Sequence, residues 1–336
     1  MLVAGAGMAG LCAAARAREL GAEPVVLEKG SRPGGSMLLS SCVVWRYRTF
    51  EDFRAECPRG DEELQRVVFD GFDEALEWLV SLGPEVVCAD TPNPRTTGKR
   101  FEPRSLTEVL VRAAGDVRTG QGPGTVRGTW PIVLATGGFA VRYARDHGLL
   151  VRCNPWSEGD GLAFARERGA ETAGDLDEFY GRAMPAPPAR IGEEDYVRLS
   201  QLWDGEARVV NEHGEEFFPG PPAWHESDLA QAIARQPGGT AWFIVPAGLR
   251  DDPRVVAARE AGGTVVEGHG ELRLHVAAAV THTQGGIAVD SQARVKGVDG
   301  LFAAGADVGG ISTGGYSSGL AAALVMGRVA AESAAK

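Results

Sequence analysis

Short apolar runs that lead into glycine recur along the chain and predict buried strands. They occupy residues 2–4, 132–139 and 300–310, and a further strand is predicted over residues 23–27, whose last three residues are apolar. A continuous apolar run bounded by glycine is typical of a strand that is buried on both faces of its sheet. The pattern therefore predicts an α/β fold.

Helices are expected between these strands. Residues 11–20, 51–82 and 105–114 carry apolar side chains at helical spacing. Ser105 is the expected N-cap of the third helix, because its hydroxyl can accept a backbone N–H. Residues 314–331 start with glycine and serine and continue as a helix of small residues. The N-terminus of that helix is a candidate site for an anion or a carbonyl oxygen.

The first turn has the spacing of a dinucleotide site. Gly5, Gly7 and Gly10 form a G-x-G-x-x-G pattern between the first strand and the first helix, and the next strand ends at Glu28. Glycine permits the tight turn, the approach of backbone N–H groups to a pyrophosphate, and close packing of helix and strand. An acid at position 28 is expected to bind ribose hydroxyls. The pattern alone does not choose between NAD and FAD.

Small residues after Glu28 extend this candidate site. Gly34, Gly35 and Ser36 follow it directly, and glycine pairs let a backbone come close to a ligand. The Thr-Gly-Gly sequence at residues 136–138 provides a second such approach. An ordinary surface turn is the alternative for the first of these loops, and its position after Glu28 favours a cofactor loop.

The amino-acid composition of the chain changes in its second half. Residues 175–248 contain Pro-rich and aromatic segments and are interpreted as a second domain. Within and just after it, residues 240–245 predict a strand and residues 251–261 a helix. Residues 281–290 lead back to the first domain.

Composition narrows the function classes. The chain has 336 residues, 44% hydrophobic content and a formal net charge of −11, so binding to a phosphate backbone is a poor hypothesis. The five cysteines lack zinc spacing and are interpreted as reduced thiols of a cytoplasmic protein, without a metal site. No apolar run is long enough to span a membrane, and no signal peptide is expected.

Together, these separated motifs resemble the FAD-dependent oxidoreductases of the fumarate reductase/succinate dehydrogenase flavoprotein family. The similarity is greatest to the soluble branch that includes 3-ketosteroid dehydrogenases. The motifs that carry it are residues 5–10 with Glu28, and residues 34–36, 135–138, 281–286, 304–307 and 318–320.

The resemblance implies an α/β architecture with a discontinuous, Rossmann-like FAD-binding domain. This domain would comprise residues 1–150 and 276–336, and an inserted α+β capping domain would comprise residues 151–275. Members of the family usually have a β-hairpin subdomain at the place that residues 115–130 occupy in this chain. The segment at residues 268–280 is also shorter than is usual in the family. Because the first strand is short too, we expect that segments are missing at these three places.

The resemblance also implies which residues meet FAD. Asp307 would contact the phosphoribityl region, and the helix starting near Gly319 would direct its N–H groups at the flavin C2 carbonyl. Ser36 replaces the histidine that carries a covalent flavin in some members, so non-covalent FAD is expected. The full set of expected cofactor contacts is Gly5, Gly7, Met8, Ala9, Gly10, Glu28, Lys29, Gly34, Gly35, Ser36, Ser40, Ser41, Ala135, Thr136, Gly137, Gly305, Asp307, Ser318, Gly319 and Leu320.

The implied reaction is α,β-dehydrogenation, or its reverse, of a carbonyl or carboxylate compound. Its partners would be a small-molecule substrate and an electron donor or acceptor. His282 is expected to bind substrate, and a structural turn residue is the alternative. Tyr316 stands where fumarate reductases carry a carboxylate-binding arginine, which argues against fumarate or succinate.

The capping domain should supply a further acid or base. Tyr180 and His225 are the leading candidates, with Arg182 and Glu226 beside them, and packing roles are the alternative for each. A flavin-binding protein of the same fold without redox turnover remains a second hypothesis. An NAD-only dehydrogenase is a third.

Overall fold

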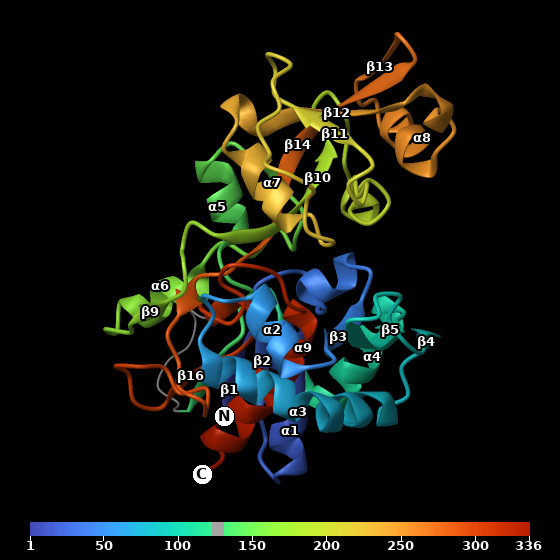
Figure 1. Cartoon of the computed structure of the whole chain (residues 1–336). Coiled ribbons are helices and arrows are strands. Elements are labelled where there is room, and N and C mark those ends of the chain that lie inside the picture. Colours follow the sequence, from blue (N-terminus) through green and yellow to red (C-terminus); the bar gives the residue numbers. More distant parts are fainter. Residues whose placement is uncertain (123–130) are drawn as a thin grey trace. The chain divides into compact units, whose positions relative to one another are not determined.

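The computed structural model describes residues 1–122 and 131–336, which form two compact units. Unit 1 comprises Met1–Phe139, Asn154–Glu178 and His282–Lys336, and unit 2 comprises Ala140–Cys153 and Phe179–Thr281. Figure 1 labels their helices and strands.

A five-stranded parallel sheet is the centre of unit 1. The order of its strands is β16-β7-β1-β2-β6. Their bounds are Leu301–Ala303, Ile132–Leu134, Leu2–Ala4, Val25–Glu28 and Asp116–Thr119. Val3 of β1 is paired with Val26 on one side and Val133 on the other. The short first strand therefore occupies the middle of the sheet, and the turn after it lies at the sheet's carboxyl edge.

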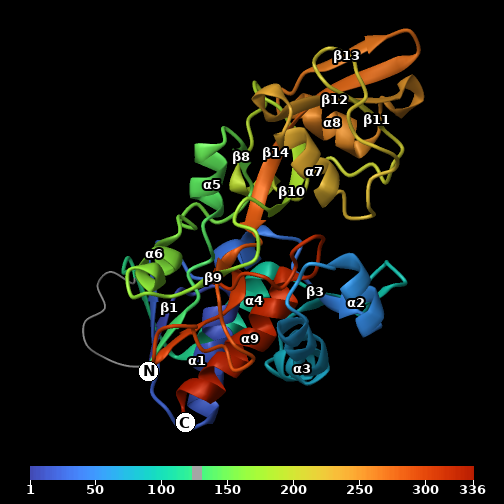
Figure 2. The same cartoon turned by 60° about the vertical axis from the view of Figure 1, so that its left-hand side comes forward.

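Helices α1 (Met8–Glu19) and α9 (Gly319–Ala334) lie side by side, as Figures 1 and 2 both show. A Cβ atom at Gly327 would lie 2.4 Å from the carbonyl oxygen of Ala9, so glycine permits this close packing. The two ends of the chain thus build one helical layer. Among the described helices, none combines the length and the apolar character needed to cross a membrane.

The helix predicted over residues 51–82 is two helices, α2 (Phe50–Glu56) and α3 (Glu62–Ser81). Pro58 and Gly60, which both disfavour a helix interior, lie in the break. Asp61 starts α3 by accepting a hydrogen bond from Leu64 N. The predicted N-cap at Ser105 is wrong. Helix α4 (Pro103–Ala114) is capped by the Glu102 carboxylate, which accepts from Ser105 N.

Smaller elements complete unit 1. They are an antiparallel sheet of β3 (Val43–Tyr47), β5 (Thr96–Phe101) and β4 (Val86–Cys88), the pair β9 (Thr172–Ala173) and β15 (Gly286–Ile287), helix α6 (Asp160–Arg166), and the 3₁₀ turns η1 (Gly35–Leu39) and η6 (Gly305–Asp307).

Unit 2 is built on the 13-residue strand β14 (Glu271–Thr283), whose last two residues belong to unit 1. Its sheet follows the order β10-β14-β12-β11, with β13 and β8 also paired to β14. The other strands are β8 (Leu150–Val151), β10 (Phe179–Pro185), β11 (Arg208–Val210), β12 (Thr240–Pro246) and β13 (Val265–Gly268). The helices are α5 (Ala140–Asp146), α7 (Ser227–Ala234) and α8 (Pro253–Glu260), with short 3₁₀ turns η3 (Glu193–Asp195), η4 (Pro237–Gly239) and η5 (Ala247–Leu249). The strand expected at 240–245 and the helix expected at 251–261 are confirmed as β12 and α8.

The units differ from the predicted domain bounds in three places. Asn154–Glu178, which we expected in the capping domain, packs in unit 1, because β9 pairs with β15. Ala140–Cys153 packs in unit 2, because β8 pairs with β14. Residues 276–281, which we expected in the FAD-binding domain, belong to unit 2 as part of β14. The first two differences come from short strand pairings that the hydrophobic pattern does not reveal.

Candidate functional site

The turn between β1 and α1 needs glycine at its two ends for packing. Gly5 has a φ of +107°, and a Cβ there would lie 2.1 Å from the carbonyl oxygen of Ala135. A Cβ at Gly10 would lie 1.9 Å from the carbonyl oxygen of Gly5. Strand, turn and helix are therefore locked together by close backbone contacts.

Gly7 differs from these two glycines. Its φ is −81°, which any residue adopts, and the nearest described atom to a Cβ built there is Gly35 Cα at 4.0 Å. The packing of the chain itself leaves room at position 7. An open space beside a helix N-terminus is what a pyrophosphate requires.

The start of α1 is suited to an anion. In the described part of the chain no side chain caps this helix, and its first residues, Met8, Ala9 and Gly10, carry no acid. The first N–H groups of a helix have no partner within it, and the helix dipole favours negative charge there. These residues fit a dinucleotide phosphate.

Glu28 is directed at the same turn. Its buried carboxylate accepts hydrogen bonds from Ala6 N at 2.8 Å and from Gly30 N at 2.7 Å. A carboxylate oxygen has a second lone pair, so Glu28 can also accept from ribose hydroxyls. Lys29 forms ion pairs with Glu158 at 2.5 Å and Asp160 at 2.9 Å.

The loop after Glu28 reaches the turn. Gly34 N donates to Ala6 O at 2.8 Å, and a Cβ at Gly35 would lie 3.1 Å from Gly7 Cα. The Ser36 hydroxyl accepts from Asn154 N at 3.0 Å. The structure therefore brings Gly34 and Gly35 close to the first glycine turn, and their contacts with FAD stay predictions.

Two serines of this loop hold its own backbone. The Ser40 hydroxyl donates to Met37 O at 2.9 Å and accepts from Cys42 N at 3.0 Å. The carbonyl oxygen of Ser41 accepts from Arg100 Nε at 3.2 Å. Their contacts with FAD stay predictions.

Asp307 joins the second glycine turn. Its buried carboxylate accepts from the Thr136 hydroxyl at 2.9 Å, from Gly138 N at 3.1 Å and from Thr136 N. Burial raises the pKa of Asp307, and the hydrogen bonds oppose that rise. Ala135, Gly137 and Gly305 flank this arrangement, and Gly305 has a φ of +68°.

His282 lies at the N-terminus of α9. A Cβ at Gly319 would be 3.3 Å from the Cε1 atom of the imidazole. Ser318 caps the helix by accepting from Ala321 N at 3.2 Å, and Leu320 follows in the first turn. Desolvation by burial lowers the pKa of His282 to about 4, so the ring is neutral at pH 7. A neutral imidazole beside a helix N-terminus can stabilise negative charge that develops on a bound molecule.

Tyr316 lies in the loop that leads into α9. Its carbonyl oxygen accepts from the Tyr47 hydroxyl at 2.8 Å, and its ring centroid is 5.4 Å from that of Trp45. The backbone and the ring are thus both held, and the side chain is partly buried. This arrangement suits a positioned hydroxyl donor.

Two further residues, which the predicted site does not include, fix this loop. Glu178 is buried and accepts from Gly314 N at 2.8 Å and from Arg59 at 2.9 Å. Gln284 donates to Gly315 O at 2.8 Å. Gln284 stood within a recognised motif, whereas no motif marked Glu178.

The candidates of unit 2 form one buried cluster. The Arg182 guanidinium lies 4.7 Å from the Tyr180 ring centroid and donates to the carbonyl oxygen of His225. His225 Nδ1 accepts from Ser227 N at 3.0 Å. Glu226 accepts from two backbone N–H groups, and burial raises its pKa. Their catalytic roles stay predictions.

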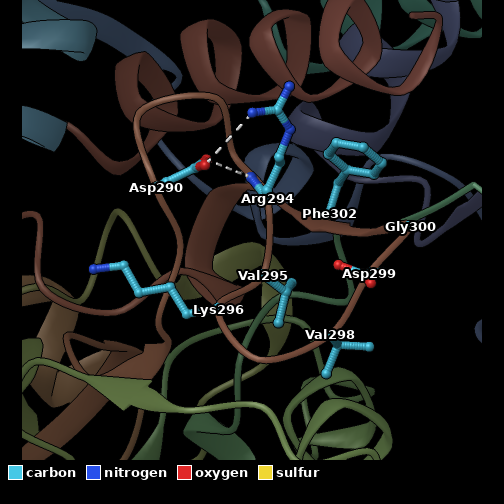
Figure 3. Close-up of a pocket in the computed structure, with 8 residues that line it drawn as sticks. All are labelled: Asp290, Arg294, Val295, Lys296, Val298, Asp299, Gly300 and Phe302. Carbon is cyan, nitrogen blue, oxygen red and sulfur yellow. Dashed lines mark hydrogen bonds and ion pairs between the residues drawn. The ribbon is translucent and has the colours of Figure 1, made fainter.

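A surface hollow of about 350 Å³ lies elsewhere in unit 1, and Figure 3 shows its lining. Asp290 and Arg294 approach within 3.8 Å across a turn, and Lys296 and Asp299 add one charge of each sign. None of the predicted site residues lines this hollow, and its balanced charges favour no ligand class.

Comparisons with known proteins identify the family of the chain. A family profile described as "FAD binding domain" matches residues 93–320, and one described as "NAD(P)-binding Rossmann-like domain" matches residues 3–42. The predicted family, Rossmann-like fold class and FAD cofactor are thereby confirmed.

The similar proteins are redox enzymes. A probable fumarate reductase of Shewanella frigidimarina, Ifc3, is 24% identical over an alignment covering 100% of this chain and 74% of the relative. An NADH:fumarate oxidoreductase of Klebsiella pneumoniae is also 24% identical, and the chain spans 47% of its length. A solved 3-ketosteroid-Δ4-(5α)-dehydrogenase from Rhodococcus jostii RHA1 superposes with a TM-score of 0.71 at 19% identity, covering 100% of this chain and 96% of that one.

Proposed function

The chain belongs to the FAD-binding domain family, and we propose that it is an FAD-dependent oxidoreductase acting on C–C bonds. The reaction would be the α,β-dehydrogenation of a carbonyl or carboxylate compound, or its reverse. The relatives named above, a fumarate reductase and a 3-ketosteroid dehydrogenase, support this class.

The observation that carries the proposal is the position of His282 against Gly319. It puts a neutral imidazole at the N-terminus of α9, in the same unit as the turn at Gly7 and the carboxylate of Glu28. A nucleotide-binding turn and a charge-stabilising helix end within one unit are the two features that a flavin enzyme needs.

Different residues of the chain would bind different parts of FAD. Gly7 and the first turn of α1 would hold the pyrophosphate, and Glu28 would bind the adenosine ribose. The first turn of α9 would stabilise negative charge on the flavin carbonyl. Bound FAD would supply the ring that accepts or donates the hydride.

His282 and Tyr316 would orient the substrate. A neutral imidazole and a phenol can each donate one hydrogen bond to a carbonyl oxygen and polarise it. Because a tyrosine cannot form the bidentate ionic contact of an arginine, we propose a carbonyl compound rather than a dicarboxylate. Tyr180 and His225 remain our candidates for proton transfer.

The partners and location follow from chemistry. We propose a small organic substrate and a separate electron donor or acceptor, with no role for nucleic acid. The five cysteines are free thiols, which is usual in a reducing compartment, so we propose a cytoplasmic location.

The test is turnover by the FAD-loaded protein. Conjugated ketones and unsaturated carboxylates are offered with a chemically reduced electron carrier, and the saturated products are quantified. The reverse reaction is assayed with a quinone acceptor. Turnover of a conjugated ketone, lost in His282→Ala with FAD retained, is the expected result. Full FAD loading without turnover of any such compound in either direction would refute the proposal.

A further inference from the structure

We propose that Asp307 supports FAD binding as a positioning residue, through a hydrogen-bonded relay from Asp307 to Thr136 to Gly161. In this relay the carboxylate fixes the glycine turn at residues 136–138 instead of serving only as a direct acceptor for the cofactor. The inference rests on the proposed FAD site alone, so a test of it by FAD affinity does not depend on the redox reaction proposed above.

The carboxylate of Asp307 accepts hydrogen bonds from groups of the protein itself. Its Oδ1 atom accepts from the Thr136 hydroxyl at 2.9 Å and from Gly138 N at 3.1 Å, and its Oδ2 atom accepts from Thr136 N. Asp307 is 1% exposed. Three donors from a single turn therefore surround one buried charge, and such charge-assisted bonds hold a backbone strongly.

The hydroxyl of Thr136 extends the relay. It has one hydrogen, which it donates to Asp307, and its lone pairs accept from Gly161 N at 3.1 Å. A Cβ at Gly161 would lie 2.5 Å from that hydroxyl oxygen and 2.9 Å from each carboxylate oxygen. The first turn of α6 thus packs directly onto the relay, at a distance that only glycine permits.

The first residue of α6 connects this relay to the first half of the site. Asp160 precedes Gly161 and forms an ion pair with Lys29 at 2.9 Å. Lys29 follows Glu28, whose carboxylate accepts from Ala6 N. Because Lys29 and Asp160 are both about one-third exposed, this pair contributes orientation more than energy. The relay therefore couples the ribose-binding acid to the second glycine turn within unit 1.

Removal of the Thr136 hydroxyl distinguishes the relay from a direct contact between Asp307 and FAD. The Thr136 hydroxyl is bonded to protein groups on both sides, so its removal should weaken FAD binding only if the relay positions the turn. Thr136→Ser keeps the hydroxyl and is the matched control for Thr136→Val. Asp307→Asn replaces one acceptor oxygen by an NH2 group, which then faces the N–H of either Thr136 or Gly138, and so disrupts the relay at its other end.

The experiment is a double-mutant cycle on FAD affinity, measured by titrating the apoprotein and following quenching of flavin fluorescence. We expect Thr136→Val and Asp307→Asn each to weaken binding at least about tenfold, and Thr136→Ser to stay within about twofold of the wild type. The double variant should bind within about threefold of Asp307→Asn alone, because both changes break one relay.

Two results would overturn the proposal. One is wild-type affinity in Thr136→Val together with weak binding in Asp307→Asn, which would make Asp307 a direct contact only. The other is a double variant whose loss equals the product of the single losses. If Asp307→Asn does not fold, the pair Thr136→Val and Thr136→Ser decides alone. A lower melting temperature of the Thr136→Val apoprotein does not support the relay if FAD binds it normally, because that is the first of these two results.

Discussion

The imidazole of His282 packs on the first residue of helix α9, where a Cβ at Gly319 would lie 3.3 Å from the ring's Cε1 atom. Burial lowers the pKa of His282 to about 4. The positive end of the helix favours the neutral ring as well. This one contact places an uncharged hydrogen-bonding group beside the helix end that the flavin would use.

The contact predicts a pH-dependent stability. The pKa of His282 is about 4 in the folded protein and near 6.5 when exposed, so the unfolded state binds more protons between these values. The stabilising contribution is present above pH 6.5 and is lost as the pH falls towards 4. The free energy of unfolding of the apoprotein should therefore fall less between about pH 7 and about pH 5 in His282→Gln. Urea titrations at both pH values measure this.

The matched control is His213→Gln, which changes an exposed histidine of unit 2. It should follow the wild-type pH dependence. An unchanged slope in His282→Gln would show that the ring is not held neutral by its surroundings.

Substitutions at Gly5 and Gly7 should have different effects: the first should lower the free energy of unfolding, and the second should weaken FAD binding. A Cβ at Gly5 meets Ala135 O at 2.1 Å, so Gly5→Ala should lower the free energy of unfolding by at least about 2 kcal/mol. At Gly7 the protein has room, so Gly7→Val should lose less than about 1 kcal/mol and yet weaken FAD binding at least about a hundredfold. Chemical unfolding of the apoprotein and FAD titration report the two effects separately. A Gly7→Val protein that keeps its flavin would contradict the pyrophosphate assignment.

The nucleotide turn could be predicted from sequence because its determinants are local. The spacing of Gly5, Gly7 and Gly10 and the distance to Glu28 fix its geometry within one βαβ unit. The break between α2 and α3 was also predictable, because Pro58 and Gly60 lie in it, but the expectation of one helix over residues 51–82 gave more weight to the apolar spacing on either side. The cap of α4 was also missed, because Glu102 competes with Ser105 for the same role.

The rest of the site depends on contacts between distant segments. Asp307 and Thr136 are 171 positions apart, and Glu178 and Gly314 are 136 apart. Hydrophobic patterning carries no information about such pairs. Only the resemblance marked Asp307, and nothing in the sequence marked Glu178 or the contact of Gly161 with Thr136.

The substitution Tyr316→Phe removes the phenolic hydroxyl and keeps the ring. The ring would keep its contact with Trp45, and the backbone would keep its bond with Tyr47, so the loop should stay in place. We expect kcat on a conjugated ketone to fall about tenfold to a hundredfold while the Kd for FAD stays within about twofold. Wild-type turnover in Tyr316→Phe would remove the tyrosine from the substrate site.

The flavin is predicted to be non-covalent. Ser36 provides a hydroxyl, which accepts from Asn154 N, in place of an imidazole that could carry a flavin. Precipitation of the holoprotein with acid should release all of the yellow colour into the supernatant. Colour that stays with the pellet after washing in denaturant would contradict this expectation.

The most direct test of the central claim is the visible spectrum of the reduced holoprotein on anaerobic mixing with a conjugated ketone. The flavin is first reduced with dithionite, and excess reductant is removed. We expect the oxidised flavin spectrum to return and saturated ketone to form in an amount equal to the flavin. A reduced flavin that stays bleached with conjugated ketones and unsaturated carboxylates alike, and is reoxidised only by air, would contradict it.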